Sequence, residues 1–360
     1  MRAGRGKHDR RRRRSRAGRY RRVAGRRLMS DPAAEPQKKR HHYIPITYLT
    51  RFTDPEGRVV AYQKDEPEKV LRLAPKSIAF ERYYYSQPLP EGGRDNNTLE
   101  DLFSTFESDW PGVVEALERG RETPAHLDAL FNFLGLLRSR TPAARDAYEH
   151  YLAHTVKRTA KLMDKWGQLP PPPEGLEDLL DHIDVAIDPH MSLHAMPVMM
   201  QALALVFERI GFEVVHNETR DDFVTSDNPV AYFDPDQPED GMRPFDLRRD
   251  TGRIEFLCPI SPRLLIRGRS ELPILRPGMR MGHVRVTSGS EVRRVNRMTA
   301  RFAYRFVFAA NTGLEAFVAR YAALSPGIAF ETAEAGDGEL SIIRMVFAPR
   351  APKPKWKPSG

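Results

Sequence analysis

The stretch DDFVTSDNPVAYF at residues 221–233 decides how the middle of the chain is expected to fold. The residues Phe-Val-Thr at 223–225 have the aromatic and β-branched side chains that favour strands, and Ser-Asp-Asn-Pro at 226–229 are turn formers in succession. Because Asn228 precedes a proline, its backbone is restricted to extended conformations. The sequence therefore predicts a strand that ends in a tightly defined turn.

A polar site is expected at this turn, because loops at strand ends commonly present functional groups from a rigid scaffold. Asp227 would act there as an acid or metal ligand, with Ser226 and Asn228 as binding residues. Asp221 lies on the same face of the predicted strand but about 20 Å along it, too far to share a metal ion unless the turn folds back. The alternative is structural, since Asp and Asn side chains often close their own turn by bonding nearby backbone N–H groups.

Strand and turn patterns continue on both sides of this stretch. The expected strands cover residues 212–216, 223–226, 230–233, 254–257, 264–267, 283–287, 305–309 and 341–347. Helices are expected at 290–303 and 314–321, where apolar side chains recur at helical spacing. Nearer the N-terminus, residues 58–64 and 69–73 are typical of a strand hairpin, and a helix is expected to begin near Pro45.

Helical patterns dominate residues 98–210. Thr123 and Thr141 each precede a proline, which is typical of an N-cap followed by proline in the first helical turn, and Thr98 with Asp101 resembles a capping box. These features predict a run of helices in this part of the chain.

The last of these helices, at 188–210, contains Pro197 and is expected to be kinked. Strands before and after a helical part predict the α+β class, with a mainly antiparallel mixed sheet covered by a helical layer or insertion. A single domain is expected over residues 39–348.

The positive charge of the chain is concentrated at its N-terminus. The whole chain carries +9, and residues 1–28 carry +13 from thirteen Arg and one Lys against one Asp, so the remaining residues carry −4. The leader, residues 1–38, is expected to be a disordered arm that attracts nucleic acid without sequence preference. Alternatively, translation starts at Met29 and the arm is not part of the protein. The proline-rich end, residues 349–360, is also expected to be disordered.

Composition argues against export and membrane insertion. No apolar segment of about 7 to 15 residues follows the paired arginines, as an export signal would require. The longest apolar run, 196–207, is interrupted by Pro197 and Gln201 and is shorter than the roughly 20 residues of a membrane-spanning helix. The one cysteine, Cys258, cannot form an internal disulfide, which fits a reducing compartment. A soluble, cytoplasmic protein is predicted.

Several other polar residues are candidates for chemistry. His42 lies beside a predicted helix start, where an imidazole keeps a low pKa and can act as a base or ligand. Arg140 and Arg145 flank the junction of two predicted helices and could clamp an anion, although arginine at a helix end often only complements the dipole. Asn296 lies between apolar residues of a predicted helix and needs hydrogen-bond partners there.

Other chemical motifs are weak or missing from the sequence. His150 with His154, and His190 with His194, have the four-residue spacing of helical metal ligands, but neither pair has the adjacent glutamate of the HExxH motif. We interpret both pairs as structural. The sequence contains no glycine-rich phosphate loop, GxSxG elbow or CxxC pair.

Five separated pieces together resemble the bacterial family of unknown function DUF4238. They are HHYIPITYLTRF at 41–52, EDLFSTFES with LLRSRTPAAR within 100–145, FVTSDNPV at 223–230, CPISPRLLI at 258–266 and VNRMTARFAYRFVFA at 295–309. The resemblance implies no established reaction, substrate or cofactor. The positions that match it are His42, Tyr43, Pro45, Leu49, Phe52, Arg140, Arg145, Ser226, Asp227, Pro229, Pro262 and Asn296.

Two hypotheses of function follow, and the sequence leaves open whether the protein is an enzyme. The favoured one is a non-catalytic binding or interaction protein with a polar site around the SDNP turn, in which Tyr43 joins the binding residues. The alternative is a metal-assisted hydrolase or nuclease acting on a phosphodiester, in which His42, Asp227, Arg140 and Asn296 are catalytic. The alternative would use a divalent metal ion, whose ligands the sequence does not identify.

Overall fold

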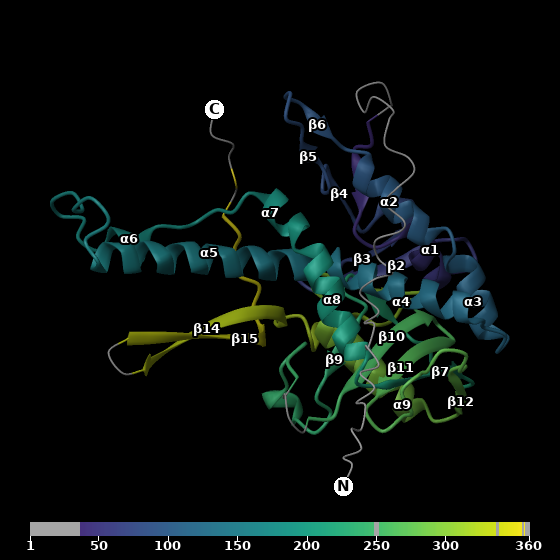
Figure 1. The fold of residues 1–360 in the computed structure, drawn as a ribbon. Coiled ribbons are helices and arrows are strands. Elements are labelled where there is room, and N and C mark those ends of the chain that lie inside the picture. The colour runs from purple at the N-terminus through teal and green to yellow at the C-terminus, as the bar shows by residue number, and fades with distance from the viewer. Residues whose placement is uncertain (1–36, 248–251, 336–337, 355, 357–360) are drawn as a thin grey trace, which may run out of the picture. The chain divides into compact units, whose positions relative to one another are not determined.

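The computed structural model describes residues 37–247, 252–335, 338–354 and 356 (Figure 1). Residues 38–360 cluster as one unit, and residues 1–37 as another. The predicted arginine-rich arm, with its expected disorder and nucleic-acid binding, lies outside the described residues apart from its last positions. The described part is α+β, as the sequence predicted.

The largest sheet has five strands and is antiparallel except at one edge. In order across the sheet the strands are β12 (Gly282–Val286), β7 (Gly211–Asn217), β11 (Leu264–Arg269), β10 (Glu255–Ser261) and β9 (Ala231–Phe233). Only the β12–β7 pair is parallel among the pairs of this sheet. Each of its five strands overlaps a predicted one, and β7, β10 and β11 extend beyond the predicted bounds.

Both faces of the central strands of this sheet are buried. Val214 and Ile266 belong to a core cluster formed with α3 (Trp110–Glu118), α4 (Pro124–Ser139) and α8 (Met196–Phe207). Val215 and Leu265, one residue along each strand, belong to a second cluster formed with α9 (Gly289–Phe302). Because successive strand residues point to opposite faces, helices cover both sides of the sheet. The predicted helical layer is therefore joined by α9 on the opposite face.

A second sheet of four strands contains the SDNP turn at its edge. Its order is β3 (Val70–Leu73), β2 (Val59–Gln63), β13 (Phe306–Ala309) and β8 (Thr225–Ser226). The predicted hairpin at 58–64 and 69–73 is confirmed as β2 and β3. The SDNP turn joins β8 in this sheet to β9 in the larger one, so it is the point where the chain crosses between the two sheets.

Short elements complete the N-terminal part. The helix α1 (Ile46–Leu49) begins after Pro45, as predicted, and continues as a 3-10 turn at Thr50–Phe52. Strand pairing before and after it was not predicted, because two- and three-residue strands have no readable period. The remaining elements are β1 (Arg40–His42) with β4 (Phe80–Arg82), β5 (Gln87–Pro88) with β6 (Arg94–Asp95), and a 3-10 turn at Pro75–Ser77.

The predicted Thr-Pro caps are confirmed at two helices. Thr123 accepts a hydrogen bond from the His126 N–H at the start of α4, and Thr141 accepts one from the Ala144 N–H at the start of α5 (Pro142–Lys165). The capping box predicted at Thr98 is wrong. Thr98 is the first residue of α2 (Thr98–Glu107), and Asp95 accepts from the N–H groups at its start.

The helical stretch predicted at 188–210 is divided in two. It forms α7 (Pro189–His194) and α8, separated at Ala195, because Pro197 occupies the first turn of α8. Among the described residues, Pro189–Phe207 is long and apolar enough to cross a membrane, with 19 residues, a mean hydropathy of 1.3 and 33% of that window buried. No such segment was predicted, because the apolar run was counted only from 196. The short α6 (Leu179–His182) precedes these helices.

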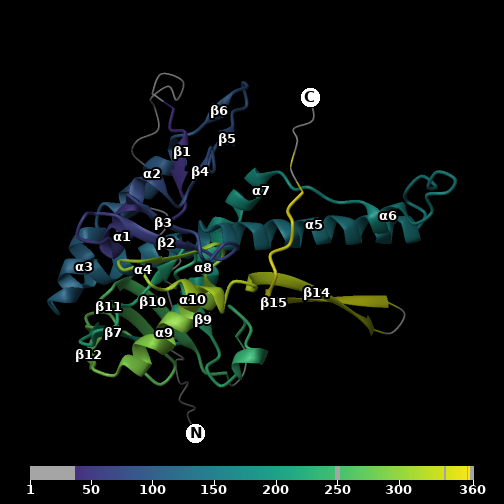
Figure 2. The ribbon, with the colours of Figure 1, turned by 180° about the vertical axis from the view of Figure 1, so that it is seen from behind.

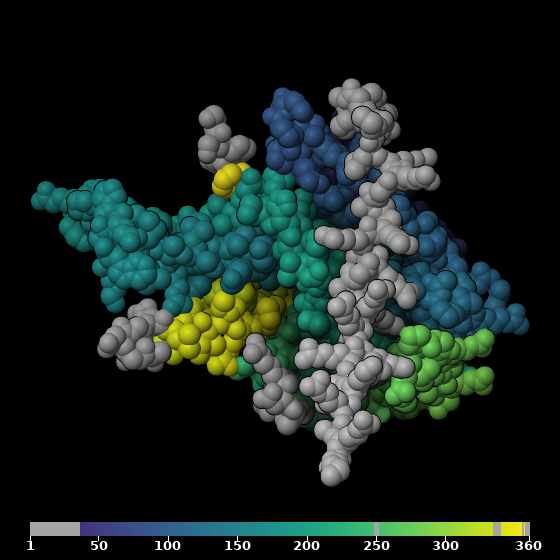
Figure 3. Space-filling view, viewed as in Figure 1, coloured from purple at the N-terminus to yellow at the C-terminus, as the bar shows by residue number. Residues whose placement is uncertain are grey.

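The C-terminal part contains a long hairpin of which only the second strand was predicted. The strands β14 (Ser325–Ala335) and β15 (Gly338–Ala348) follow α10 (Glu315–Ala319). The hairpin lies along α5 in both ribbon views and in the space-filling view (Figures 1, 2 and 3). The His154 ring stacks on Phe330 at 3.8 Å between centroids, and His154 Nε2 lies 3.0 Å from Ser341 Oγ.

Candidate functional site

The carboxylate of Asp227 lies in the interior and is held by backbone groups. It is 0% exposed, and its two oxygens accept hydrogen bonds from the N–H groups of Tyr304 at 2.8 Å and Arg305 at 2.7 Å. Burial raises the pKa of Asp227, while these N–H groups act to lower it. Asp227 therefore connects the SDNP turn by hydrogen bonds to the segment between α9 and β13.

The neighbouring turn residues are also buried and paired. The N–H of Asn228 donates to Ser226 Oγ at 3.2 Å, which closes the turn locally. The Asn228 amide donates to the carbonyl of Phe302 at 2.7 Å, and its oxygen lies 3.5 Å from Thr141 Oγ1. Asn228 thus contacts both the end of α9 and the cap of α5.

Arg140 binds the segment that carries His42 and Tyr43. Its Nε donates to the Tyr43 carbonyl at 3.1 Å and one terminal nitrogen donates to the His42 carbonyl at 2.6 Å. The other terminal nitrogen pairs with Glu107 at 2.7 Å. Arg140 is 1% exposed, so all three nitrogens are used inside the protein.

The side chains of His42 and Tyr43, which are neighbours in the sequence, lie in different surroundings. The His42 ring lies against Phe80, with Nε2 3.3 Å from the Lys76 carbonyl, and burial lowers the pKa of His42 with a contribution from Arg140. Tyr43 is 3% exposed. Burial raises the pKa of its phenol, and the negative charge of Asp227 raises it further.

Arg145 and Asn296 hold other parts of the fold. Arg145 donates to Ser192 Oγ at 2.9 Å and to the carbonyls of Tyr84 and Pro189. The Asn296 side chain pairs with the backbone at both ends of the segment before β8, accepting from the Val224 N–H at 3.0 Å and donating to the Asp222 carbonyl at 2.8 Å. Both side chains connect helices to neighbouring segments.

The structure thus joins three of the predicted segments. Arg140 connects the end of α4 to His42 and Tyr43, Thr141 connects the start of α5 to Asn228, and Asp227 lies near enough to Tyr43 for its negative charge to raise the pKa of the phenol. Asn296 brings in a fourth predicted segment, because from α9 it bonds the backbone of Asp222 and Val224. Arg145 instead binds Tyr84, Pro189 and Ser192, outside these segments.

Four residues that the sequence analysis did not single out extend this cluster toward solvent. Asp146, 7% exposed, accepts from the Tyr304 hydroxyl at 2.9 Å and lies 3.7 Å from the Arg305 guanidinium. Arg305 also pairs with Glu81 at 3.0 Å, and both of these side chains are 39% exposed. Three of these residues could have been found from their place in the sequence motifs. Asp146 directly follows LLRSRTPAAR, and Tyr304 and Arg305 lie inside VNRMTARFAYRFVFA.

Lys353, from the proline-rich end of the chain, contacts two buried carboxylates. Its ammonium donates to Asp146 at 3.0 Å and forms an ion pair with Glu149, which is 3% exposed. Burial disfavours the charged ammonium, but Asp146 and Glu149 outweigh it and raise the pKa of Lys353. We call Asp146 and Glu149 the carboxylate pair.

The segment before Lys353 is also attached. Arg350 donates to the Tyr304 carbonyl and to Ser325 Oγ, and it pairs with Asp65. A cavity of about 40 Å³ lies beside it, large enough for a water molecule. His150 lines this cavity, and its Nε2 is buried without a hydrogen-bond partner.

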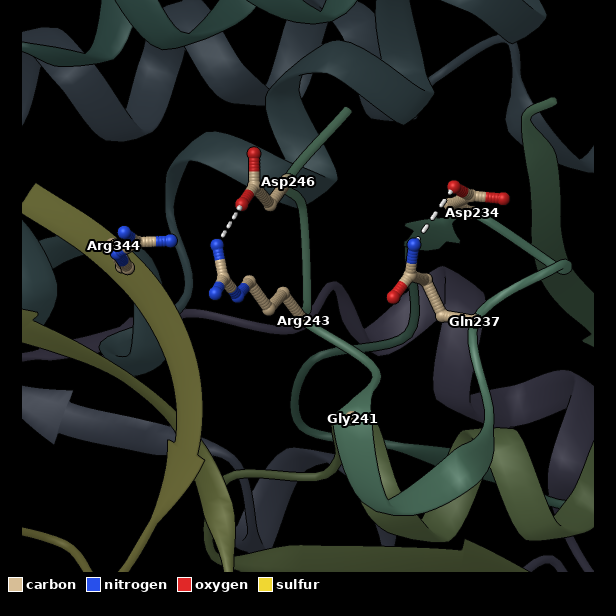
Figure 4. A pocket seen from close by; sticks show the side chains of 6 residues that line it. All are labelled: Asp234, Gln237, Gly241, Arg243, Asp246 and Arg344. Carbon is tan, nitrogen blue, oxygen red and sulfur yellow. Dashed lines mark hydrogen bonds and ion pairs between the residues drawn. The ribbon is translucent and has the colours of Figure 1, made fainter. Parts of the chain in front are cut away.

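A second, larger cavity of about 280 Å³ lies at the loop after β9 (Figure 4). This loop includes the 3-10 turn Glu239–Gly241. Arg344 of β15 also lines the cavity. Its charged groups are largely paired: Arg243 with Asp246 at 3.5 Å, and Arg344 with Glu331 at 2.9 Å. The lining residues are Asp234, Gln237, Gly241, Arg243, Asp246 and Arg344.

None of the predicted site residues lines either cavity. Across the described ranges, no three His, Cys, Asp or Glu side chains are placed to hold one metal ion. The roles of His42, Asp227, Arg140 and Asn296 in catalysis, and of Ser226, Asn228, Arg145 and Tyr43 in binding, stay predictions.

Comparisons with other proteins place the cluster in a family. No curated protein and no solved structure matches the chain. The family model described as "Protein of unknown function (DUF4238)" matches residues 40–313, which include the SDNP turn, Arg140 and the carboxylate pair. The β14–β15 hairpin, Arg350 and Lys353 lie beyond the match. The chain belongs to the DUF4238 family, as its five sequence motifs predicted.

Proposed function

We propose that this protein is a non-catalytic binding protein whose carboxylate pair recognises a lysine side chain in a basic, proline-containing peptide segment. The observation that carries the proposal is the position of Lys353 on Asp146 and Glu149. In the structure this lysine comes from the chain itself and occupies the place that a partner's lysine would take.

The carboxylate pair has a physical need for a cation. With the Lys353 segment in place, Asp146 and Glu149 are 7% and 3% exposed, and a charge buried in this way costs several kcal/mol unless it is paired. Arg305 reaches Asp146 only at 3.7 Å, and Ser192 Oγ supplies Glu149 with a neutral donor at 2.8 Å. An ammonium group is therefore the complementary ligand for this pair.

The surroundings hold the pair in place before a ligand arrives. The Tyr304 hydroxyl fixes Asp146, and Ser192 fixes Glu149. Tyr304 is itself fixed because its N–H donates to Asp227, the central residue of the predicted site. Preorganised acceptors lose little entropy on binding, which favours recognition of a single cationic group.

The occupant has the character of a recognition peptide. Residues 349–354 have no regular hydrogen-bonded structure and read PRAPKP, a composition that favours the extended polyproline conformation. Such segments bind with little ordering cost and present their side chains to grooves. Since the carboxylate pair lies inside the family match and the tail lies outside it, the site belongs to the domain and its occupant does not.

The contacts of the predicted catalytic residues also favour binding over phosphodiester hydrolysis. The polar groups of Asp227 and Arg140 are engaged by backbone atoms and by Glu107. A general acid, a base or an anion clamp requires groups that can reach a substrate. Their arrangement supports a role in holding the carboxylate pair and the surrounding segments in position.

The proposal is tested with the full chain carrying Arg350→Ala and Lys353→Ala, which releases the tail from the site. A labelled peptide with the sequence of residues 348–360 is added, and binding is measured by fluorescence anisotropy. The released variant should bind the peptide at least tenfold more tightly than the unaltered chain, because the intramolecular lysine no longer competes.

The control adds Asp146→Asn and Glu149→Gln to the released variant and should abolish this binding. Glu115→Gln, at an exposed carboxylate of α3, should leave it unchanged. Circular dichroism confirms that each variant is folded. Equal peptide binding by the released variant and by its Asp146→Asn, Glu149→Gln derivative would overturn the proposal.

A further inference from the structure

Beside the carboxylate pair lies a second binding site for a side chain of the same tail segment. The chain after β15 crosses α5 (Figure 2), where Lys353 reaches the carboxylate pair. Arg350, three residues earlier, reaches the Tyr304 carbonyl, Ser325 Oγ and the Asp65 carboxylate. We call these three acceptors the arginine subsite. The Arg350 side chain is 17% exposed, so most of it is enclosed there.

The arginine subsite is complementary to a guanidinium group. One terminal nitrogen of Arg350 donates to the Tyr304 carbonyl and, at 3.1 Å, to Ser325 Oγ, and the other pairs with Asp65. The guanidinium carbon also lies 5.7 Å from the centre of the Tyr304 ring, within reach of a cation–π interaction. A guanidinium presents its donors on a rigid planar fork. It therefore fits acceptors that are distributed over three residues.

The carboxylate pair has a different preference. Asp146 and Glu149 both contact the single ammonium nitrogen of Lys353. A lysine ammonium is a compact point charge, which fits acceptors that converge on one position. The two subsites therefore distinguish arginine from lysine by the arrangement of their acceptors.

Tyr304 belongs to both subsites and fixes their separation. Its carbonyl accepts from Arg350, and its hydroxyl donates to Asp146 of the carboxylate pair at 2.9 Å. Its own N–H donates to Asp227 at 2.8 Å, which holds the residue in place. Asp65, Tyr304 and the carboxylate pair lie inside the family match, and Ser325 lies beyond it. The domain therefore supplies most of both subsites.

The spacing of the two basic residues matches one turn of a polyproline helix. This conformation has three residues per turn and rises about 3.1 Å per residue, so residues i and i+3 point the same way, about 9 Å apart. In the structure, Ala351 and Pro352 are exposed, while Arg350 is half-buried and Lys353 contacts the buried carboxylates. A segment with this period presents both basic side chains to the domain at once.

We propose that the partner recognised by this protein carries an arginine and a lysine three residues apart, in the order Arg-x-x-Lys, within a polyproline-type segment. This inference rests on the proposed function and deepens it, because it adds the arginine subsite and the spacing. Residues 349–354, PRAPKP, contain the motif and occupy both subsites. Two contacts made by one stiff segment strengthen binding only when their spacing matches the two subsites.

The test is competition against the labelled peptide of residues 348–360, bound to the released variant. The unlabelled competitor APRAPKP, residues 348–354, should displace it. APKAPRP has the same composition and charge in the reversed order and should compete at least tenfold more weakly. APRPKP and APRAAPKP have one residue fewer or more between the basic residues, and should also compete at least tenfold more weakly.

Variants of the arginine subsite test its contribution separately. Asp65→Asn with Ser325→Ala, added to the released variant, should weaken binding of the labelled peptide at least fivefold. The same peptide with alanine in place of Arg350 should bind equally well with and without these two changes. Asp65→Asn alone, at a 71% exposed side chain, tests the subsite if Ser325→Ala prevents folding, which circular dichroism reports. Glu68→Gln, at an exposed carboxylate of the same loop as Asp65, is the matched control and should change nothing.

Equal competition by APRAPKP, APKAPRP and the two peptides of altered spacing would overturn this inference, and so would failure of APRAPKP to compete. Either result would leave the proposed function standing, because the labelled peptide would still be bound. If the labelled peptide does not bind the released variant at all, the proposed function fails and this inference fails with it.

Discussion

At the scale of single residues, the polar side chains of this protein act mainly by satisfying backbone groups. Asp227 receives two N–H groups from the residues after α9, and Arg140 donates to two carbonyls of the segment before α1. Lys64, 1% exposed, donates to the carbonyls of Ala300 and Ala303 at the end of α9, and burial lowers its pKa to about 7. Loops and helix ends that would otherwise carry unpaired polar groups are stabilised in this way.

The first prediction concerns Asp227. Asp227→Asn replaces one of two accepting oxygens with an NH₂ group that faces a backbone N–H donor, so one buried N–H loses its acceptor. Urea unfolding should report a loss of about 1–3 kcal/mol in the free energy of unfolding. The control, Asp236→Asn at a 57% exposed carboxylate, should change it by less than about 0.5 kcal/mol. A loss at position 227 no larger than the control's would contradict this account.

The second prediction concerns the pH dependence of Glu100. Burial raises the pKa of Glu100 from 4.5 to about 7, against the opposing effect of Arg140. Since the folded state favours the neutral acid, its stabilising contribution is complete below pH 4.5 and is lost as pH rises through 7.

Glu100→Gln removes this titration. Urea unfolding at pH 5 and pH 8 should therefore show the variant gaining stability relative to the unaltered chain at the higher pH. Glu115→Gln, at an exposed position, should show no such trend. The prediction fails if the difference between Glu100→Gln and the unaltered chain is the same at both pH values.

At the scale of elements, the C-terminal hairpin is attached to the domain through few side chains. The His154 ring of α5 stacks on Phe330, and Phe347 packs edge-on against Phe302 of α9. The strands β14 and β15 pair only with one another among the described strands. Loss of one attachment should therefore loosen the hairpin without loosening the sheets.

The third prediction follows from this attachment. His154→Ala should speed hydrogen exchange at the β14 amides at least fivefold while leaving the β10 and β11 amides unchanged, because opening energies differ between weakly attached and central elements. Mass spectrometry of exchanged peptides measures both regions at once. The control is Tyr321→Ala, which removes an aromatic ring that packs on Phe317 and on the core cluster around β2 and β13. Uniform acceleration across all regions in His154→Ala would show global destabilisation instead.

At the scale of the whole molecule, charge divides the chain into an arm and a body. Residues 1–28 carry +13 and the other residues carry −4. The arm lies outside the described residues, so its interactions stay a prediction. We expect the full chain to bind duplex and single-stranded nucleic acid with an affinity that falls steeply with salt concentration.

A chain beginning at Met29 is the comparison for this fourth prediction, because it removes the arm and retains all of the residues that match the family. Electrophoretic mobility shift at 50 mM and 200 mM salt should show binding by the full chain at low salt only, and none by the shorter chain. Salt-independent binding by the shorter chain would assign nucleic-acid recognition to the domain instead.

The sequence by itself determined the local features of this protein. The Thr-Pro caps, the β2–β3 hairpin and the α+β class all depend on residues a few positions apart, through proline's fixed backbone angle, side-chain caps and apolar periodicity. The strand predicted at 223–226 is confirmed only at Thr225–Ser226, directly before the turn. The short pair β1–β4 and the strand β14 escaped prediction because their patterns are too brief or too irregular to have a readable period.

Only the tertiary structure decided which groups meet. Asp227 finds its N–H partner 77 residues away, Arg140 finds the His42 carbonyl 98 residues away, and Lys353 reaches Asp146 across 207 residues. No local rule relates such positions, because a polar side chain takes its partner from whichever segments the packing of the core brings beside it. The core packing of two sheets and their helices therefore set the partners of the SDNP turn. It also placed the carboxylate pair beside Lys353, and His216 beside His283, although these residues are far apart in the sequence.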